Sequence, residues 1–161
     1  MEEMATTEVQ TRIALPAQEV FALIAQPDRH PLWQKDLTSD GLVSGDGTVG
    51  SRGREVRRVM GRSVTTEYEI TEHTDSTDGT DGTGPMVWGF RSLRGPIDMA
   101  GVFTCAPADD GCEVRARISF GGWSGQAMAR FATRQFAGYL DDLKELAESG
   151  GHPAGDPAPR A

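Results

Sequence analysis

Residues 9–35, VQTRIALPAQEVFALIAQPDRHPLWQK, decide the fold of this chain. Apolar and polar side chains alternate from Val9 to Leu15, which is the period of a half-buried strand. Pro16 ends that strand and suits the first position of a helix, where an amide proton would have no partner. The sequence therefore predicts a strand that leads directly into a helix.

The helix that follows is short. Its apolar residues repeat at helical spacing, and Pro27 stops it within about three turns. Asp28 is expected to cap a second short helical turn, with Leu32 and Trp33 directed inward. A strand and two short helices in this order indicate a particular architecture, which the rest of the chain specifies.

Composition limits the possible classes of function. The chain has 161 residues and a formal net charge of -8, with a pI of about 4.8. Nucleic-acid binding is not expected, because phosphates require a basic footprint. No run approaches the roughly 20 apolar residues of a membrane span and no export signal is recognised, so we expect a cytoplasmic protein without integral membrane association. We expect residues 8–148 to form one domain, between a flexible N-terminus (1–7) and a disordered tail rich in Gly and Pro (149–161).

Residues 54–70 are expected to form the first hairpin. A two-residue turn at Gly61 and Arg62 would pair Met60 with Ser63 and place Arg54 opposite Glu69 on a charged, solvated face. The other face should then point inward; it carries Glu55, Arg57, Thr66 and Tyr68.

Two further hairpins follow by the same reasoning. A turn at Arg94 and Gly95 would set Trp88 opposite Gly101 and Arg91 opposite Asp98. Pairing Cys105 with Cys112 would close the third hairpin. The first of these registers also aligns Met86 with Phe103 and Phe90 with Met99, and the second aligns Gly101 with Ala116. The two thiols could form a disulfide or stay reduced as small buried side chains, which is usual in a cytoplasmic protein.

Beyond Gly122 the apolar period becomes helical. A stripe runs for about six turns behind Ser124, a plausible cap. It comprises Met128, Phe131, Ala132, Phe136, Leu140, Leu143 and Ala147.

The element order, the LPAQEVFALIAQPDRHPLW run and the FAGYLDDLKELAE ending resemble the START-related SRPBCC superfamily, especially its bacterial polyketide cyclase/dehydrase and lipid-transport branch. The resemblance covers residues 6–148. It implies an α+β helix-grip fold of order β-α-α-β6-α, in which a curved antiparallel sheet of about seven strands wraps around a long C-terminal helix. It also implies an internal hydrophobic cavity between sheet and helix. The motifs are diffuse, so the match informs the fold more than the chemistry.

Neither a cofactor nor a metal is predicted. The stretch from Gly45 to Gly50 matches GxGxxG, but a strand-like segment follows it where a dinucleotide site needs a helix. The aspartates at 75, 78 and 81 lack the spacing of a calcium loop, and the three histidines are scattered.

Glu55, Arg57 and Tyr68 are the candidate catalytic residues. A buried acid, base and phenol beside aromatic walls could enolise and cyclise a poly-ketone, with Glu55 as general base, Arg57 steadying the enolate and Tyr68 donating a proton. The alternative is a structural polar cluster near the rim of the barrel. The candidate ligand-binding residues are Thr66, Met86, Trp88, Phe90, Met99, Gly101, Phe103, Ala116, Met128, Phe131 and Phe136.

Two functions follow from these candidates. The first is a cofactor-independent enzyme, a polyketide cyclase, aromatase or dehydratase. The second is a non-catalytic carrier or sensor of a hydrophobic small molecule that resembles a lipid or a polyketide. In both cases the partner is a hydrophobic ligand. The charged outer face of the sheet predicts a monomer or a weak homodimer.

Overall fold

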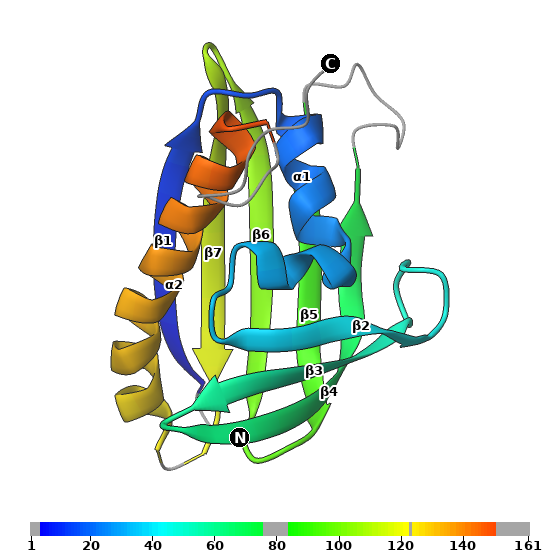
Figure 1. Cartoon of the computed structure of the whole chain (residues 1–161), viewed down its shortest axis with the longest axis vertical. Helices are drawn as coiled ribbons and strands as arrows, with labels where there is room; N and C mark the ends of the chain where they lie inside the picture. The colour runs from blue at the N-terminus through cyan, green and yellow to red at the C-terminus, as the bar shows by residue number, and fades with distance from the viewer. Residues whose placement is uncertain (1–3, 76–83, 123, 151–161) are drawn as a thin grey trace.

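A computed structural model describes residues 4–75, 84–122 and 124–150 (Figure 1). Seven strands, two α-helices and one 3₁₀ helix follow one another in these residues. In chain order they are β1 (Ala5–Ile13), α1 (Ala17–Ala25), the 3₁₀ helix η1 (Pro27–Leu32), β2 (Leu37–Ser44), β3 (Arg52–Val59), β4 (Arg62–Thr74), β5 (Met86–Arg94), β6 (Met99–Ala108), β7 (Gly111–Phe120) and α2 (Gly125–Glu148). The predicted helix-grip fold is confirmed.

All seven strands form one antiparallel sheet in the order β1-β7-β6-β5-β4-β3-β2. From β2 to β7 each strand pairs with its neighbour in sequence, while α1 and η1 carry the chain from one edge of the sheet to the other. In Figure 1 the sheet curves around α2, which packs along β1 and β7, and α1 lies over β5 and β6. The opening strand and two helices thus close one end of the sheet.

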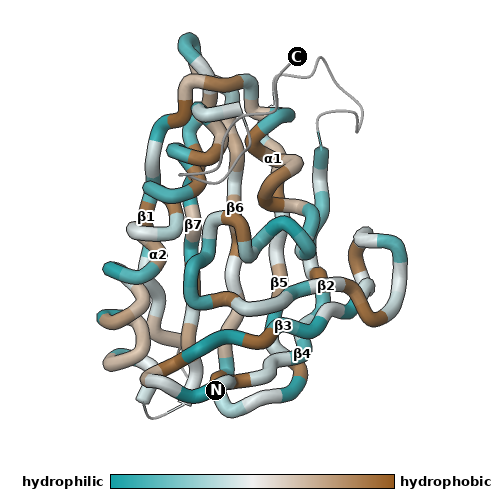
Figure 2. Tube along the Cα trace, viewed as in Figure 1, coloured by the Kyte–Doolittle hydropathy of each residue, from teal (hydrophilic) through white to brown (hydrophobic). Residues whose placement is uncertain are grey.

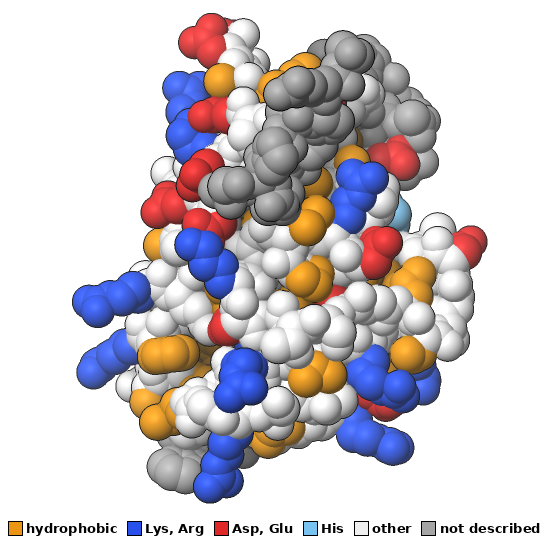
Figure 3. All heavy atoms as spheres, viewed as in Figure 1, with side chains coloured by type: hydrophobic (Ala, Val, Ile, Leu, Met, Phe, Trp, Pro, Cys, Tyr) orange, Lys and Arg blue, Asp and Glu red, His pale blue; other side chains and the backbone are white. Residues whose placement is uncertain are grey.

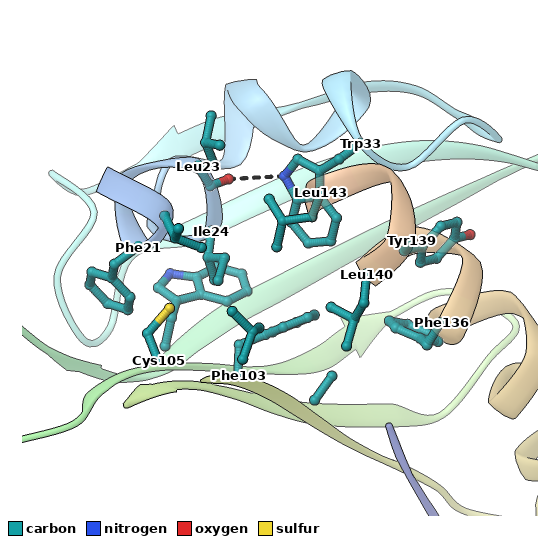
Figure 4. Packing of buried hydrophobic residues seen from close by; sticks show 14 of the residues in the cluster. Phe21, Leu23, Ile24, Trp33, Phe103, Cys105, Phe136, Tyr139, Leu140 and Leu143 are labelled. Atoms are coloured by element: carbon teal, nitrogen blue, oxygen red, sulfur yellow. Dashed lines mark hydrogen bonds between the residues drawn. The ribbon is translucent and has the colours of Figure 1, made fainter. Parts of the chain in front are cut away.

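The core fills the space between the sheet and the helices. Hydrophobic and hydrophilic residues alternate along the strands and recur at intervals along the helices (Figure 2). Figure 4 shows side chains of both helices and of β6 converging in this layer. Trp33 is fully buried there, as predicted, whereas Leu32 is 42% exposed and so does not point inward. Successive residues around a 3₁₀ helix point in directions about 120° apart, so Leu32 at the end of η1 and Trp33 directly after it do not face the same side.

The first hairpin turns one residue earlier than predicted. Val59 pairs with Arg62, so Met60 and Gly61 form the turn, and both have positive φ, 51° and 81°. Two positive φ angles are what a type I′ hairpin turn requires. The register is displaced by two residues, and Arg54 therefore faces Glu67, with which it forms an ion pair at 2.9 Å. Because side chains alternate with period two, this error leaves the predicted inner face unchanged.

The other two hairpin registers are also wrong by two residues. Phe90 pairs with Gly101, Trp88 with Phe103 and Met86 with Cys105, because the β5–β6 connection is wider than a two-residue turn. β6 and β7 instead run on to a tight turn after Ala108, which aligns Phe103 with Ala116, Gly101 with Ile118 and Cys112 with Pro107. Arg91 faces Ala100 rather than Asp98, and its carboxylate partner is Glu69 at 2.9 Å. The predicted inner and outer faces are again retained.

Helix α2 confirms most of the predicted apolar stripe. Ala132, Phe136, Leu140, Leu143 and Ala147 are buried. Met128 is only partly buried, and Phe131 has 57% of its surface exposed. Ser124 stands at the N-cap position, but its hydroxyl makes no capping hydrogen bond.

The last helix ends at Glu148, and β1 begins at Ala5, three residues inside the segment 1–7 that was expected to be flexible. Residues 151–161 of the predicted tail, and the aspartates at 78 and 81, lie outside the described residues. Among the helices of the described residues, none has the length and apolarity required to cross a membrane.

Candidate functional site

The space between the sheet and the helices contains a small cavity with one polar and one apolar wall. Its volume is about 30 Å³, enough for roughly one water molecule. The polar wall consists of His30, Gln34, Asp40, Glu55, Arg57 and Tyr68, and the apolar wall of Trp88, Phe90, Met99, Phe103 and Phe136. Four segments far apart in the sequence therefore meet here: η1 with its exit, the β2–β4 strands, β5 with β6, and α2.

Arg57 is the centre of the polar wall. Its guanidinium donates to Glu55 at 2.9 Å, to Gln34 Oε1 at 2.7 Å and to Asp36 at 3.1 Å. It also donates to the hydroxyl of Tyr139, at 2.5 Å. The side chains of Arg57 and Glu55 are only 13% and 11% exposed. A buried charge needs such compensation, because an unpaired charge in this position would cost several kcal/mol.

Asp36 extends the network toward α2. One carboxylate oxygen accepts from Arg57 and from the hydroxyl of Tyr139, and the other accepts from Gln135 Nε2 at 2.6 Å. The helix is thereby tied to the loop that precedes β2 by hydrogen bonds as well as by apolar packing.

A second polar chain joins η1 to the sheet. His30 Nε2 donates to the carbonyl of Ile24 at 2.7 Å, and His30 Nδ1 lies 2.7 Å from Asp40 Oδ2. The hydroxyl of Tyr68 donates to Asp40 Oδ1 at 2.6 Å. Since the carbonyl can only accept, Nε2 is the donor in the hydrogen bond to Ile24.

Both tyrosines of the chain remain neutral phenols. Burial raises the pKa of Tyr68 far above its ordinary value, and the nearby carboxylate of Asp40 raises it further. Burial likewise raises the pKa of Tyr139, against the opposing effect of Arg57. For Arg57, burial lowers the pKa, but Glu55, Tyr139 and Asp36 outweigh that effect and the pKa ends above its usual value. The cavity therefore offers a permanent cation and a phenolic donor at any physiological pH.

Trp88 in the apolar wall has a buried polar group, its indole N–H. It is 2% exposed, and its indole N–H has no hydrogen-bond partner within the described part of the chain. The indole of Trp33 donates instead to the carbonyl of Leu23 at 3.0 Å (Figure 4). A buried donor without a partner is rare in native proteins and needs an explanation.

An apolar groove leads from the surface to the interior cavity. It lies between the β3–β4 hairpin and the first half of α2, and its volume is about 40 Å³. It is lined by Val59, Val64, Thr66, Ile97, Phe120, Met128, Phe131, Ala132 and Gln135, together with Glu55, Arg57, Met99 and Phe136, which it shares with the interior cavity. The exposed ring of Phe131 stands at its outer end.

Most of the candidate residues therefore lie in the cavity or the groove. Glu55, Arg57, Tyr68, Trp88, Phe90, Met99, Phe103 and Phe136 line the cavity, and Thr66, Met128 and Phe131 line the groove. Three residues lie elsewhere. Met86 borders a separate surface hollow beside α1, and neither Gly101 nor Ala116 is among the residues that line the cavity or the groove. A side chain at Gly101 would collide with Phe90 and Ile118 rather than enter the cavity, because a Cβ there would lie 2.6 Å and 2.7 Å from them.

Sequence reasoning missed three of the six residues of the polar wall, His30, Gln34 and Asp40. It also missed Asp36, Gln135 and Tyr139, which extend the hydrogen bonds of that wall toward α2. Tyr139 could have been found, because it falls three residues after Phe136 on the buried face of α2. Asp36 and Asp40 lie in an irregular segment and the edge strand β2, where no periodic pattern marks a residue as inward.

The remaining sequence candidates have structural roles. Cys105 and Cys112 are both buried free thiols on neighbouring strands, at diagonal rather than opposite positions. The glycine-rich stretch 45–50 connects β2 to β3 and leads into a strand, which is not the context of a dinucleotide fingerprint. Within the residues that the structure describes, no group of three or more His, Cys, Asp or Glu side chains is arranged to hold a metal.

Solved structures share this architecture. The aromatase/cyclase Zhui from Streptomyces sp. R1128 superposes with a TM-score of 0.73 at 17% identity, over 95% of this chain and 99% of that chain. A START superfamily protein from Mycobacterium smegmatis gives 0.69 at 10% identity, over 91% and 97%. Ara h 8.0201 gives 0.67 at 14% identity, over 92% and 100%. Identities this low establish a shared fold and nothing more.

Sequence comparison supplies the family. A search of curated proteins finds no significant match to the chain. Residues 4–148, however, match the family model described as polyketide cyclase / dehydrase and lipid transport. This match spans nearly the whole chain and every element of the fold. The chain belongs to the polyketide cyclase/dehydrase and lipid transport family, within the SRPBCC superfamily that the sequence resembled.

Proposed function

We propose that this protein binds a hydrophobic small molecule with a neutral polar end, a carbonyl or hydroxyl group, in the groove between α2 and the β3–β4 hairpin. One observation carries the proposal: the apolar groove and the polar cavity meet at Glu55, Arg57, Met99 and Phe136. A ligand lying along the groove would bring its inner end against the guanidinium of Arg57. Membership of the family supports a hydrophobic ligand.

The charges favour a neutral polar end over a carboxylate. Asp36 and Glu55 carry two negative charges against the one positive charge of Arg57, so the cluster is already net negative. An anionic ligand would add a third negative charge in a poorly solvated place. A carbonyl oxygen can instead accept from a guanidinium or an indole N–H, and the indole N–H of Trp88 has no partner within the residues that the structure describes.

Binding requires side chains to move. The volumes of about 30 and 40 Å³ are far below the several hundred Å³ of typical ligand pockets. Met99, Met128 and Phe131 lie where a ligand would enter, and methionine side chains adapt easily to a new neighbour. We propose that the ligand displaces these side chains while the hydrogen-bonded polar wall stays in place.

Three naphthalenes of similar size test the binding mode by their own fluorescence. We expect 2-acetylnaphthalene to bind about tenfold more tightly than 2-ethylnaphthalene, because one hydrogen bond to a charged donor contributes roughly 1.5 kcal/mol. We expect 2-naphthoate to bind more weakly than both. Tighter binding of the carboxylate would contradict the proposed charge selection.

Matched variants locate the site. Val64→Trp fills the groove and should abolish binding of 2-acetylnaphthalene, whereas Val56→Trp on the opposite face of the same hairpin should not. Equal binding by both variants would place the ligand elsewhere.

The second candidate is catalysis by the same site. Glu55, Arg57 and Tyr68 line one cavity, and the raised pKa of Tyr68 keeps its hydroxyl protonated. In this proposal Glu55 removes a proton next to a ligand carbonyl, Arg57 stabilises the enolate, and Tyr68 protonates the product of ring closure. Glu55→Gln and Tyr68→Phe should each reduce turnover of a poly-ketone by about a hundredfold or more while binding persists. Wild-type rates in both variants would contradict catalysis by these residues and leave only the carrier function.

A further inference from the structure

The end of the molecule that contains the groove mouth displays basic and apolar side chains together. Two arginines come from the β3–β4 hairpin and two from the first half of α2. In the sequence, a large apolar residue lies between the two arginines of each pair. We call these residues the basic rim: Arg58, Arg62, Arg130 and Arg134, with Met60 and Phe131. In Figure 3 the Lys and Arg side chains gather over the lower half of the visible face, where the hairpin and the start of α2 lie in Figure 1.

The four rim arginines are not neutralised by the protein. All four are exposed, and none of them lies within ion-pair distance of a carboxylate in the described ranges. Arg58 does donate to the carbonyl of Gly61, at 3.1 Å, which holds it at the hairpin tip. One carboxylate, that of Asp98, lies at the same end beside Gly121. In a chain with a net charge of -8, such a group of cations is a marked local reversal.

Helix α2 concentrates its charges against its own dipole. Arg130 and Arg134 lie in its first half, and Asp141, Asp142, Glu145 and Glu148 in its second, with Lys144 as the one cation there. The first turn has no acid and the last turn no base. Helix stability favours the opposite distribution. The position of the arginines therefore has no explanation in the stability of the helix.

Met60 is the second unexplained feature. It is 94% exposed at the tip of the β3–β4 turn, with a φ of 51°. Asparagine or glycine is preferred at this position, because a side chain such as methionine is strained in the left-handed region. Neither the positive φ of Met60 nor the exposure of its apolar side chain is favourable for folding.

We propose that the basic rim docks on an anionic lipid bilayer, with Met60 and Phe131 entering the headgroup region. Protruding apolar tips flanked by arginines fit a bilayer interface, where the tips are buried and the cations meet lipid phosphates. An acidic protein would pair with the arginines but would leave a protruding Met60 without a matching surface. The groove mouth lies between the two tips, so a ligand could pass from bilayer to cavity without crossing water. Only this last point rests on the proposed function.

Vesicle flotation with the full chain tests the docking. We expect the protein to float with vesicles of phosphatidylcholine containing about one-third phosphatidylglycerol at low ionic strength. It should not float with pure phosphatidylcholine, and roughly 0.5 M salt should release it. Failure to bind anionic vesicles would overturn the proposal. Retention on immobilised poly-glutamate without vesicle binding would overturn it too, in favour of an acidic protein partner.

Two pairs of variants make the test specific. Arg130→Gln with Arg134→Gln should weaken vesicle binding at least about tenfold. The matched double variant Arg29→Gln with Arg117→Gln, both exposed and away from the rim, should change it by less than about twofold. Equal losses of vesicle binding in the two double variants would show that binding depends only on the net charge of the protein, and would overturn the proposal.

Met60→Asn tests the apolar contact with a residue that suits the turn. It should weaken vesicle binding about fivefold, whereas Val49→Asn, which alters an exposed apolar residue of the β2–β3 loop, should not. Unchanged binding of Met60→Asn would contradict insertion of the tip. Binding of 2-acetylnaphthalene should stay unchanged in all these variants, so that failure of docking and failure of the proposed function are distinguishable.

Discussion

The guanidinium of Arg57 donates a hydrogen bond at 2.9 Å to the carboxylate of Glu55, two residues earlier on the same strand. Residues two apart on a strand face the same side, so this pair is local in sequence. The groups that complete it, Gln34, Asp36 and Tyr139, come from other parts of the chain. The pair is thus built into β3, but its burial is possible only once the helices have packed on the sheet.

We predict that Arg57 and Glu55 are strongly coupled in stability. Arg57→Met should lower the free energy of unfolding by about 3 kcal/mol, because it leaves two carboxylates without their cation. Glu55→Gln should cost less, since Asp36 still balances the guanidinium. Urea denaturation of both single variants and the double variant gives the coupling energy. Additive losses would show that the two groups do not act as a pair.

We predict that neither tyrosine ionises until the protein unfolds. The pKa values of Tyr68 and Tyr139 are raised in the folded state, so above about pH 10 the unfolded chain binds fewer protons than the folded chain. This contribution to stability is complete below pH 10 and is lost as pH rises, by up to about 1.4 kcal/mol per pH unit for each tyrosine. Tyrosinate absorbance near 295 nm should therefore rise together with the loss of near-ultraviolet circular dichroism.

The chain makes this measurement direct because it contains only these 2 tyrosines. Tyr68→Phe should halve the absorbance change and reduce the pH dependence of stability. A tyrosinate signal that develops near pH 10 in the folded protein would contradict the hydrogen bond to Asp40.

We predict different costs for two tryptophan substitutions. Trp33→Phe removes the donor of a buried hydrogen bond and leaves the carbonyl of Leu23 unsatisfied. Trp88→Phe removes a donor that has no partner among the described residues, which relieves a desolvation penalty. Both lose similar ring area, so Trp33→Phe should be more destabilising by about 1–2 kcal/mol. Thermal unfolding of the two variants checks this, and equal costs would mean that Trp88 has a partner, such as water, in solution.

We predict that Gly53 is required for the position of Tyr68. Gly53 pairs with Tyr68 across β3 and β4, and a Cβ at Gly53 would lie 2.2 Å from the tyrosine ring. Gly53→Ala should displace the ring, break its hydrogen bond to Asp40 and cost about 2 kcal/mol. Gly41→Ala on the adjacent strand is the matched control, because nothing lies within 4 Å of its Cβ position. The hydroxyl of Tyr68 should then become titratable at lower pH in Gly53→Ala only.

The strand and helix periods were enough to predict the inner face of every hairpin. The registers were wrong by two residues at three turns, because sequence alone did not show that Met60 adopts a positive φ or that β6 and β7 extend to Ala108 and Gly111. An error of two residues keeps each side chain on its face. Glu55, Arg57, Tyr68 and Trp88 were therefore placed correctly inside, although their cross-strand partners were not.

The sequence by itself determined the element order, the residues that face the interior, and the family, since all three depend on local periodicity and on a diffuse pattern spread over the whole chain. Only the tertiary structure decided which polar groups compensate the buried charge of Arg57. Asp36 and Asp40 lie where the chain has no repeating pattern, and the curved sheet brings its edge strand β2 close to η1. Asp40 thereby lines the cavity, and Asp36 accepts a hydrogen bond from Arg57. Hydrogen bonds between distant segments depend on that curvature, which no local pattern encodes.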